Sequence, residues 1–122
     1  MTDLEKRQEV ERKVVRHLIR EMKKAGWIVV LIDDGGECDK DTLNPNETEA
    51  MDAVFAVDEA RIYFRKNCGS KGKMHWVFIV LGNDGWDAIC DHSCGSTHTM
   101  DDFEKVMTEQ VDPYCAKLEA EA

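Results

Sequence analysis

Residues 60–91, ARIYFRKNCGSKGKMHWVFIVLGNDGWDAICD, decide the fold because they contain three strand patterns separated by two turns. In residues 60–66, apolar side chains alternate with Arg and Tyr, the period of two that is typical of a strand with one buried face. Residues 74–81 are rich in β-branched and aromatic residues. Residues 86–91 follow an Asp-Gly pair that is typical of a β-hairpin. Connections this short predict an antiparallel, three-stranded meander.

A long amphipathic helix is predicted ahead of the meander, over residues 3–25. Apolar residues recur there every three or four positions, which places them on one helical face. Thr2 and Glu5 form a capping box at its start, and Gly26 suits the position that follows the last turn. The apolar run at residues 27–32 then predicts a strand that is buried on both faces.

Two further helices are expected. Asn46 has the side chain and the sequence context of an N-cap for a short helix before the meander. Thr99 is expected to cap the last helix. Asp112 and Pro113 are expected to interrupt that helix, with Asp112 capping a fresh segment, because a proline ring clashes with the preceding turn. The tail at residues 118–122 is expected to fray.

The resulting order is helix, strand, helix, three strands, helix. It predicts an α+β fold in which one further strand joins the antiparallel meander and the helices pack mainly on one face. A chain of 122 residues favours a single domain over residues 1–122. The N-terminus is too charged for a secretory signal, and no apolar run approaches the roughly 20 residues of a membrane span. Five cysteines without a CxxC pair favour reduced thiols, so a cytoplasmic location is expected.

The formal net charge of −9 is divided unevenly along the chain. Residues 1–32 carry net +3 and residues 60–86 carry net +4, whereas residues 33–59 carry −9 and residues 87–122 carry −7. If the two acidic blocks meet in space, they form an acidic surface suited to a basic partner. The candidate residues of this acidic surface are Asp33, Asp34, Glu37, Asp39, Asp41, Asp101, Asp102 and Glu104.

The densest cluster of metal-ligand residue types consists of Cys90, His92, Cys94 and His98. Two thiols and two imidazoles are the number and kind of ligands that a tetrahedral zinc site takes. The first three would share one face if the strand continued through them. Their spacing is not that of a zinc finger or ribbon, so zinc is an alternative and no cofactor is the main expectation. No nucleophile signature flanks either cysteine.

A basic patch on the first strand of the meander and the turn after it supports a second alternative. The patch comprises Arg61, Arg65, Lys66, Lys71 and Lys73. Because Tyr63 lies on the same predicted face as the two arginines, the patch has the mixture of aromatic and basic residues with which sheets bind RNA. The acidic blocks oppose nucleic acid, so we do not expect it to be the main partner.

The stretch from Leu81 to Ser93, LGNDGWDAICDHS, followed by an acidic C-terminal helix, resembles small accessory proteins of phages and plasmids. The resemblance covers about a third of the chain and implies no catalytic residues. It implies a role in interaction with the host, by stoichiometric binding. The small size and acidity are also similar to those of proteins that imitate DNA to block restriction or CRISPR nucleases.

The sequence shows no convergent set of acid, base and nucleophile. We therefore expect a non-enzymatic accessory protein that binds another protein, with the acidic surface as the candidate contact. The partner is unidentified, and a homo-oligomer is an open alternative.

Overall fold

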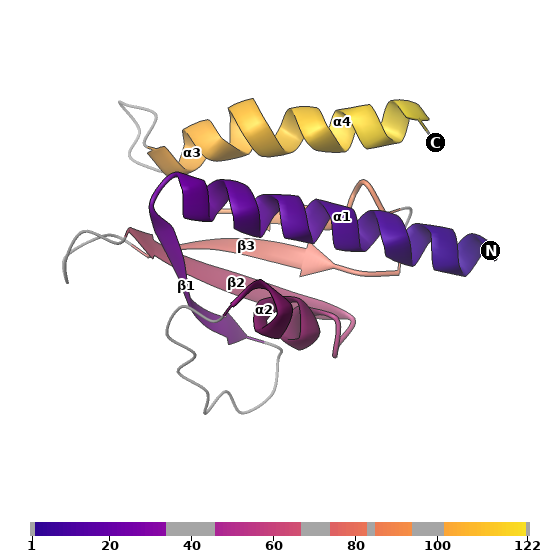
Figure 1. The fold of residues 1–122 in the computed structure, drawn as a ribbon, viewed down its shortest axis with the longest axis horizontal. Helices are drawn as coiled ribbons and strands as arrows, with labels where there is room; N and C mark the ends of the chain where they lie inside the picture. Colours follow the sequence, from indigo (N-terminus) through magenta and orange to yellow (C-terminus); the bar gives the residue numbers. More distant parts are fainter. Residues whose placement is uncertain (1, 34–45, 67–73, 83–84, 94–101, 122) are drawn as a thin grey trace.

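The structure is a computed structural model that describes residues 2–33, 46–66, 74–82, 85–93 and 102–121. Within these residues it consists of a four-stranded sheet with helices on one face (Figure 1). The elements are α1 (Asp3–Lys24), β1 (Trp27–Asp33), α2 (Glu47–Val54), β2 (Glu59–Lys66), β3 (Met74–Val80), β4 (Ile89–His92), α3 (Asp102–Val106), the π-helical segment η1 (Met107–Val111) and α4 (Asp112–Glu121). The sheet order is β1-β2-β3-β4 with every neighbouring pair antiparallel. The predicted α+β order is confirmed.

Helix α1 begins and ends as its sequence predicts. The Thr2 hydroxyl accepts the backbone N–H of Glu5 at 3.2 Å, which satisfies one of the free donors of the first turn. Gly26 follows the helix with a φ of 91°, a conformation that costs glycine little. Between these ends, Leu18 and Met22 belong to a stripe of fully buried side chains. Each such side chain contributes about 1.5–3 kcal/mol by leaving water.

Strand β1 is buried on one face only, so the prediction of a strand buried on both faces is wrong. Trp27, Val29 and Ile32 are buried, and the residues between them are half-exposed. The reason is that the helices cover only one side of the sheet. A bulge between Val29 and Leu31 shifts the alternation, which places Ile32 on the buried face.

The last strand of the meander begins later than the hairpin signal predicts. The N–H of Ala88 donates to the carbonyl of Gly85 at 3.2 Å, so this part of the chain closes a turn instead of extending. Strand β4 therefore comprises Ile89–His92 instead of residues 86–91.

The predicted interruption at Asp112 and Pro113 is also wrong. Asp112 has helical angles (φ −59°, ψ −44°), and its N–H donates to the carbonyl of Met107, five residues back. This wider π-helical turn precedes the proline, whose ring would clash with a carbonyl four residues back in a regular α-helix. The chain thus stays helical through Pro113 to Glu121.

Helix α1 lies across the sheet between the other helices, with α2 along one side and α4 along the other (Figure 1). Asn46 caps α2 as predicted, since its side-chain oxygen accepts the N–H of Glu49 at 2.8 Å. Phe103 of α3 is fully buried and contacts Trp27 at the start of β1, with ring centroids 5.4 Å apart. Among the described helices, none has a stretch that is long and apolar enough to cross a bilayer.

Candidate interaction face

The sheet face that points away from the helices is the main candidate site. Strand register places on it the residues that alternate with the buried ones, and we call it the open face. It comprises Ile28, Leu31, Asp33, Glu59, Arg61, Tyr63, Arg65, Met74, Trp76, Phe78, Val80 and Asp91. None of the described helices packs on this face.

Aromatic residues occupy the middle of the open face. Tyr63 on β2 and Trp76 on β3 are directly paired across the strands, and Leu31 of β1 is paired with Tyr63 on the other side. All three side chains are half-buried. Phe78 lies two residues beyond Trp76 on the same face. Such directly opposed side chains contact each other and form a continuous apolar row across three strands.

Arg61 lies over this aromatic row. Its guanidinium carbon is 5.1 Å from the ring centre of Trp76 and 5.3 Å from that of Phe78. Cation–π contacts of this kind contribute about 0.5–1 kcal/mol at exposed sites. These contacts also restrict the conformation of the Arg61 side chain. Its N–H groups therefore keep an orientation in which they can donate to a carboxylate or another acceptor of a partner.

A shallow hollow of about 170 Å³ lies beside Arg61. It is lined by Asp33, Glu59, Ala60, Arg61 and Phe78. Asp33 stands directly opposite Arg61 in the β1–β2 register. The hollow therefore carries both signs of charge, which suits the mixed polar surface of a protein better than a phosphate backbone.

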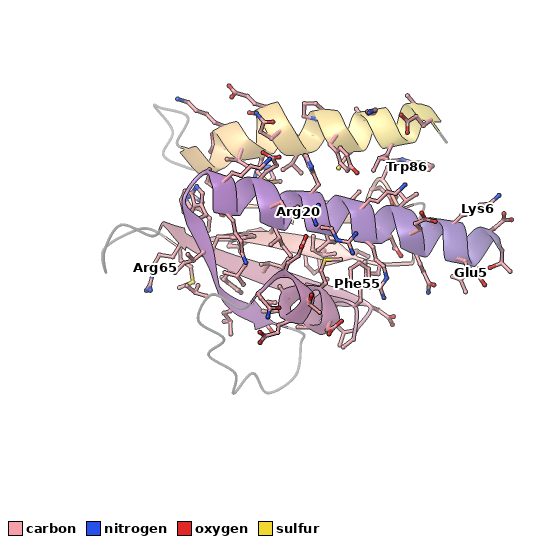
Figure 2. All side chains as sticks on the ribbon, viewed as in Figure 1. Glu5, Lys6, Arg20, Phe55, Arg65 and Trp86 are labelled. Atoms are coloured by element: carbon pink, nitrogen blue, oxygen red, sulfur yellow. The ribbon has the colours of Figure 1, made fainter. Side chains whose placement is uncertain are left out.

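Arg65 is at the other end of β2 on the same face, opposite Ile28 of β1 and Met74 of β3. Figure 2 shows its side chain projecting at the end of the sheet. Met74 is 55% exposed, one of two large hydrophobic side chains exposed to this degree among the described residues. Met and Arg are both among the residue types that protein interfaces enrich.

The described part of the predicted acidic surface does not gather in one place. Asp33 ends β1, whereas Glu104 adjoins Phe103, which contacts Trp27 at the start of the same strand. Asp33 is six positions along the strand from Trp27, or roughly 20 Å. Asp33 and Glu104, the two members of the set whose side chains the structure describes, therefore lie near opposite ends of β1.

Several predicted site residues fall where their side chains are not described. Lys66 is paired with Trp27 through the backbone, and Asp102 begins α3. The predicted residues outside the described part of the chain are Asp34, Glu37, Asp39, Asp41, Lys71, Lys73, Cys94, His98 and Asp101.

Of the predicted zinc ligands, the structure describes Cys90 and His92, and they do not share a face. A bulge leaves Cys90 outside the regular pairing, where it is an exposed free thiol. His92 is opposite Val77 and turns toward Phe103, at 6.2 Å between ring centres. Within the described residues, no group of three or more His, Cys, Asp or Glu side chains is placed to hold a metal.

His75 is a buried polar residue that sequence reasoning missed. Its ring stacks on Phe103 with centroids 4.4 Å apart, and its Nδ1 is 2.9 Å from the hydroxyl oxygen of Ser93. Ser93 also accepts the backbone N–H of Trp76 at 3.0 Å. A histidine beside a serine has the elements of a nucleophile and base, but His75 is only 3% exposed. The contacts pin the end of β4 to β3.

Comparison with protein families, with curated proteins and with solved structures finds no match to this chain.

Proposed function

We propose that the chain is a non-enzymatic accessory protein that binds another protein through the open face. The observation that carries the proposal is a group of three aromatic side chains, Tyr63, Trp76 and Phe78, on the open face. Arg61 lies over the rings of Trp76 and Phe78, and no described helix covers this face. Tyr, Trp, Phe, Met and Arg are the residue types that protein interfaces enrich. Tyr, Trp and Arg also supply most of the residues on which binding energy concentrates.

The same face supports a protein partner over nucleic acid. Bases stack on aromatic rings whose faces are free, whereas Arg61 lies over the rings of Trp76 and Phe78. A phosphate backbone also meets repulsion from Asp33 and Asp91, the first and last residues of the cross-strand row that contains Arg61 and Phe78. A protein segment that presents apolar groups to the aromatic side chains and a carboxylate to Arg61 matches both features of this face.

The partner we propose is a cytoplasmic protein of a host cell. The support is the resemblance of Leu81–Ser93 to accessory proteins of phages and plasmids, together with five cysteines that include no CxxC pair. The contact surface in this proposal is the open face, because Asp33 and Glu104, the described members of the predicted acidic surface, lie near opposite ends of β1.

Two equally exposed residues provide a matched test. Met74 on the open face and Leu4 on α1 are both 55% exposed. Each is replaced by Asp in the full chain, and each variant is used as bait in an extract of the native host. The expected result is one protein retained by the wild type and by L4D but lost from M74D. Purified partner then gives the affinities.

Retention of the same protein by all three baits would contradict the proposal, because the contact would then lie elsewhere. Fluorescence anisotropy with single-stranded oligonucleotides is the second measurement. If an oligonucleotide binds saturably to the wild type and to L4D but not to M74D, the open face is a nucleic-acid site and the proposal of a protein partner is wrong.

A further inference from the structure

A groove of about 370 Å³ runs between α1 and α4, on the helical side of the molecule. Its lining residues are Lys13, Arg16, His17, Arg20, Tyr114, Lys117, Leu118 and Glu121. Four of these eight carry a permanent positive charge and one carries a negative charge, in a chain of net charge −9. The groove therefore gathers positively charged side chains, although the chain as a whole is negatively charged.

The cations come from two helices that are about ninety residues apart in sequence. Lys13, Arg16 and Arg20 lie on one stripe of α1, at the spacing of three and four that places side chains on one helical face. The eight residues from Lys13 to Arg20 span roughly 10 Å along the helix axis. Lys117 of α4 faces this stripe across the groove. The positive strip is therefore longer than a single phosphate group.

The floor of the groove is rigid. The rings of His17 and Tyr114 stack at 4.0 Å between centroids and 17° between planes. The Nε2–H of His17 donates to the backbone carbonyl of Gln110 at 2.9 Å, since a carbonyl can only accept. Gln110 belongs to η1, and π-helical turns of this kind are frequent at functional sites. The two contacts fix the distance between α1 and α4 along the groove.

The two arginines already bind an anion together. Oε1 of Glu47 on α2 forms ion pairs with both arginines, at 2.6 Å from Nε of Arg20 and 3.6 Å from Nε of Arg16. Nη2 of Arg20 donates to the other oxygen at 3.2 Å. A guanidinium has five N–H donors, so these contacts leave most donors of the pair for a second anion. Figure 2 shows Arg20 on α1, which ends four residues later at Lys24.

We propose that this groove binds a ligand carrying several linked phosphate groups. Arginine forks match phosphate oxygens in pairs, and lysines add point charges along the strip. A chain of phosphates spans the strip from Lys13 to Arg20 and meets Lys117 on the opposite wall. A single phosphate contacts only part of it. The groove volume of about 370 Å³ suits a small ligand of this kind.

The proposal is independent of the open face. The groove belongs to the helical layer, and the open face is the other side of the sheet. Loss of phosphate binding leaves the proposed protein contact unaffected, and the converse also holds. M74D is therefore expected to bind the phosphate ligand like the wild type.

The test is calorimetric titration of the full chain with inorganic tripolyphosphate and, separately, with orthophosphate. The expected result is saturable, one-to-one binding of tripolyphosphate with an affinity at least about tenfold higher than that of orthophosphate. Absence of saturable binding of tripolyphosphate at millimolar concentration would overturn the proposal. Equal affinities for tripolyphosphate and orthophosphate would overturn the proposal that the ligand carries several phosphate groups.

Two matched double variants locate the site. K13Q/K117Q removes two positive charges from the groove, and K6Q/K105Q removes two exposed positive charges outside it. We expect tripolyphosphate affinity to fall about tenfold or more in the first and less than about twofold in the second. Equal losses in both would show attraction by overall charge alone and overturn the site.

A third variant separates shape from charge. R16K/R20K keeps both charges and removes both forks, and it is expected to weaken tripolyphosphate several-fold because an ammonium cannot bind two oxygens in a fork. Circular dichroism confirms that each variant is folded. Unchanged affinity in R16K/R20K would overturn the role assigned to the two arginines.

Discussion

The carboxylate of Glu11 accepts the backbone N–H of Gly82 at 2.7 Å, joining α1 to the connection that follows β3. Glu11 is only 3% exposed, so its charge lies where water does not reach it freely. A buried carboxylate is tolerated when a donor satisfies it. The bond fixes the end of β3 against the N-terminal half of α1.

Replacing Glu11 therefore tests whether this contact stabilises the domain. Glu11→Ala leaves the Gly82 N–H without its acceptor and opens a space on α1, and we expect a loss of about 2–3 kcal/mol in the free energy of unfolding. Glu11→Gln keeps an acceptor oxygen on a side chain of the same length, and we expect it to lose less than half as much free energy of unfolding. Urea denaturation measures both. Equal losses in the two variants would mean that the charge matters and the acceptor geometry does not.

Gly85 provides a second test at the same contact between helix and turn. Its φ is +109°, and a Cβ there would be 2.8 Å from the Cβ of Val10. Gly82 has a similar φ of +96° but has no atom within 4 Å of such a Cβ. Gly82→Ala thus measures backbone strain alone, about 1–2 kcal/mol. Gly85→Ala should lose more, by about 1–3 kcal/mol of overpacking. Similar denaturation midpoints for the two would contradict the close packing on α1.

Phe103 is expected to be the residue that anchors the C-terminal helix to the sheet. It is fully buried and contacts the rings of Trp27, Phe64 and His75. Phe103→Ala should reduce the free energy of unfolding by about 3–5 kcal/mol, because it leaves a cavity between three elements. Phe103→Leu refills part of that space and should cost less. Urea denaturation measures the loss, and equal stability of Phe103→Ala and the wild type would contradict the anchoring role.

The fold was predictable where local signals agree with packing. The capping side chains of Thr2 and Asn46 hydrogen-bond as their sequences predict. The alternation in β2 also puts Ile62 and Phe64 in the core and Arg61 on the open face. In each case, propensity, capping and burial favour the same element.

The errors occur where a tertiary contact or a rarer geometry decides. Pro113 predicts a break because the ring clashes with a regular α-helical turn, yet a π-helical turn accommodates it and the helix continues. An apolar run such as Trp27–Ile32 has the same pattern whether one face or two are covered. Whether the second face of this strand is buried depends on which side of the sheet the helices pack, and the apolar residues of the strand do not specify that side.

The candidate sites were predictable in part. Arg61 and Arg65 are on the face that period-two alternation predicts, next to Tyr63. The cationic groove was missed, although the spacing of Lys13, Arg16 and Arg20 is visible in the sequence. That spacing becomes a site only when α4 packs alongside α1, and this contact joins segments about ninety residues apart.

Cys115 on α4 makes the stability of the domain sensitive to alkaline pH. Burial raises the pKa of its thiol from 9.0 to about 11, and the negative charge of Asp112 adds to the effect. The folded state therefore holds this proton more tightly than the unfolded state. The resulting stabilisation is complete below pH 9 and is lost as the pH rises from 9 to about 11.

Cys115→Ala should remove this pH dependence. Although the variant loses some packing at every pH, the difference in unfolding free energy between wild type and variant should narrow as the pH rises from 9 to about 11. Other titrating groups affect both proteins alike and cancel. The control is Cys90→Ala, which removes an exposed thiol in place of the Cys115 thiol. Urea denaturation at half-unit pH steps measures the unfolding free energy of the three proteins, and a constant difference for Cys115→Ala would contradict a raised pKa of this half-buried thiol.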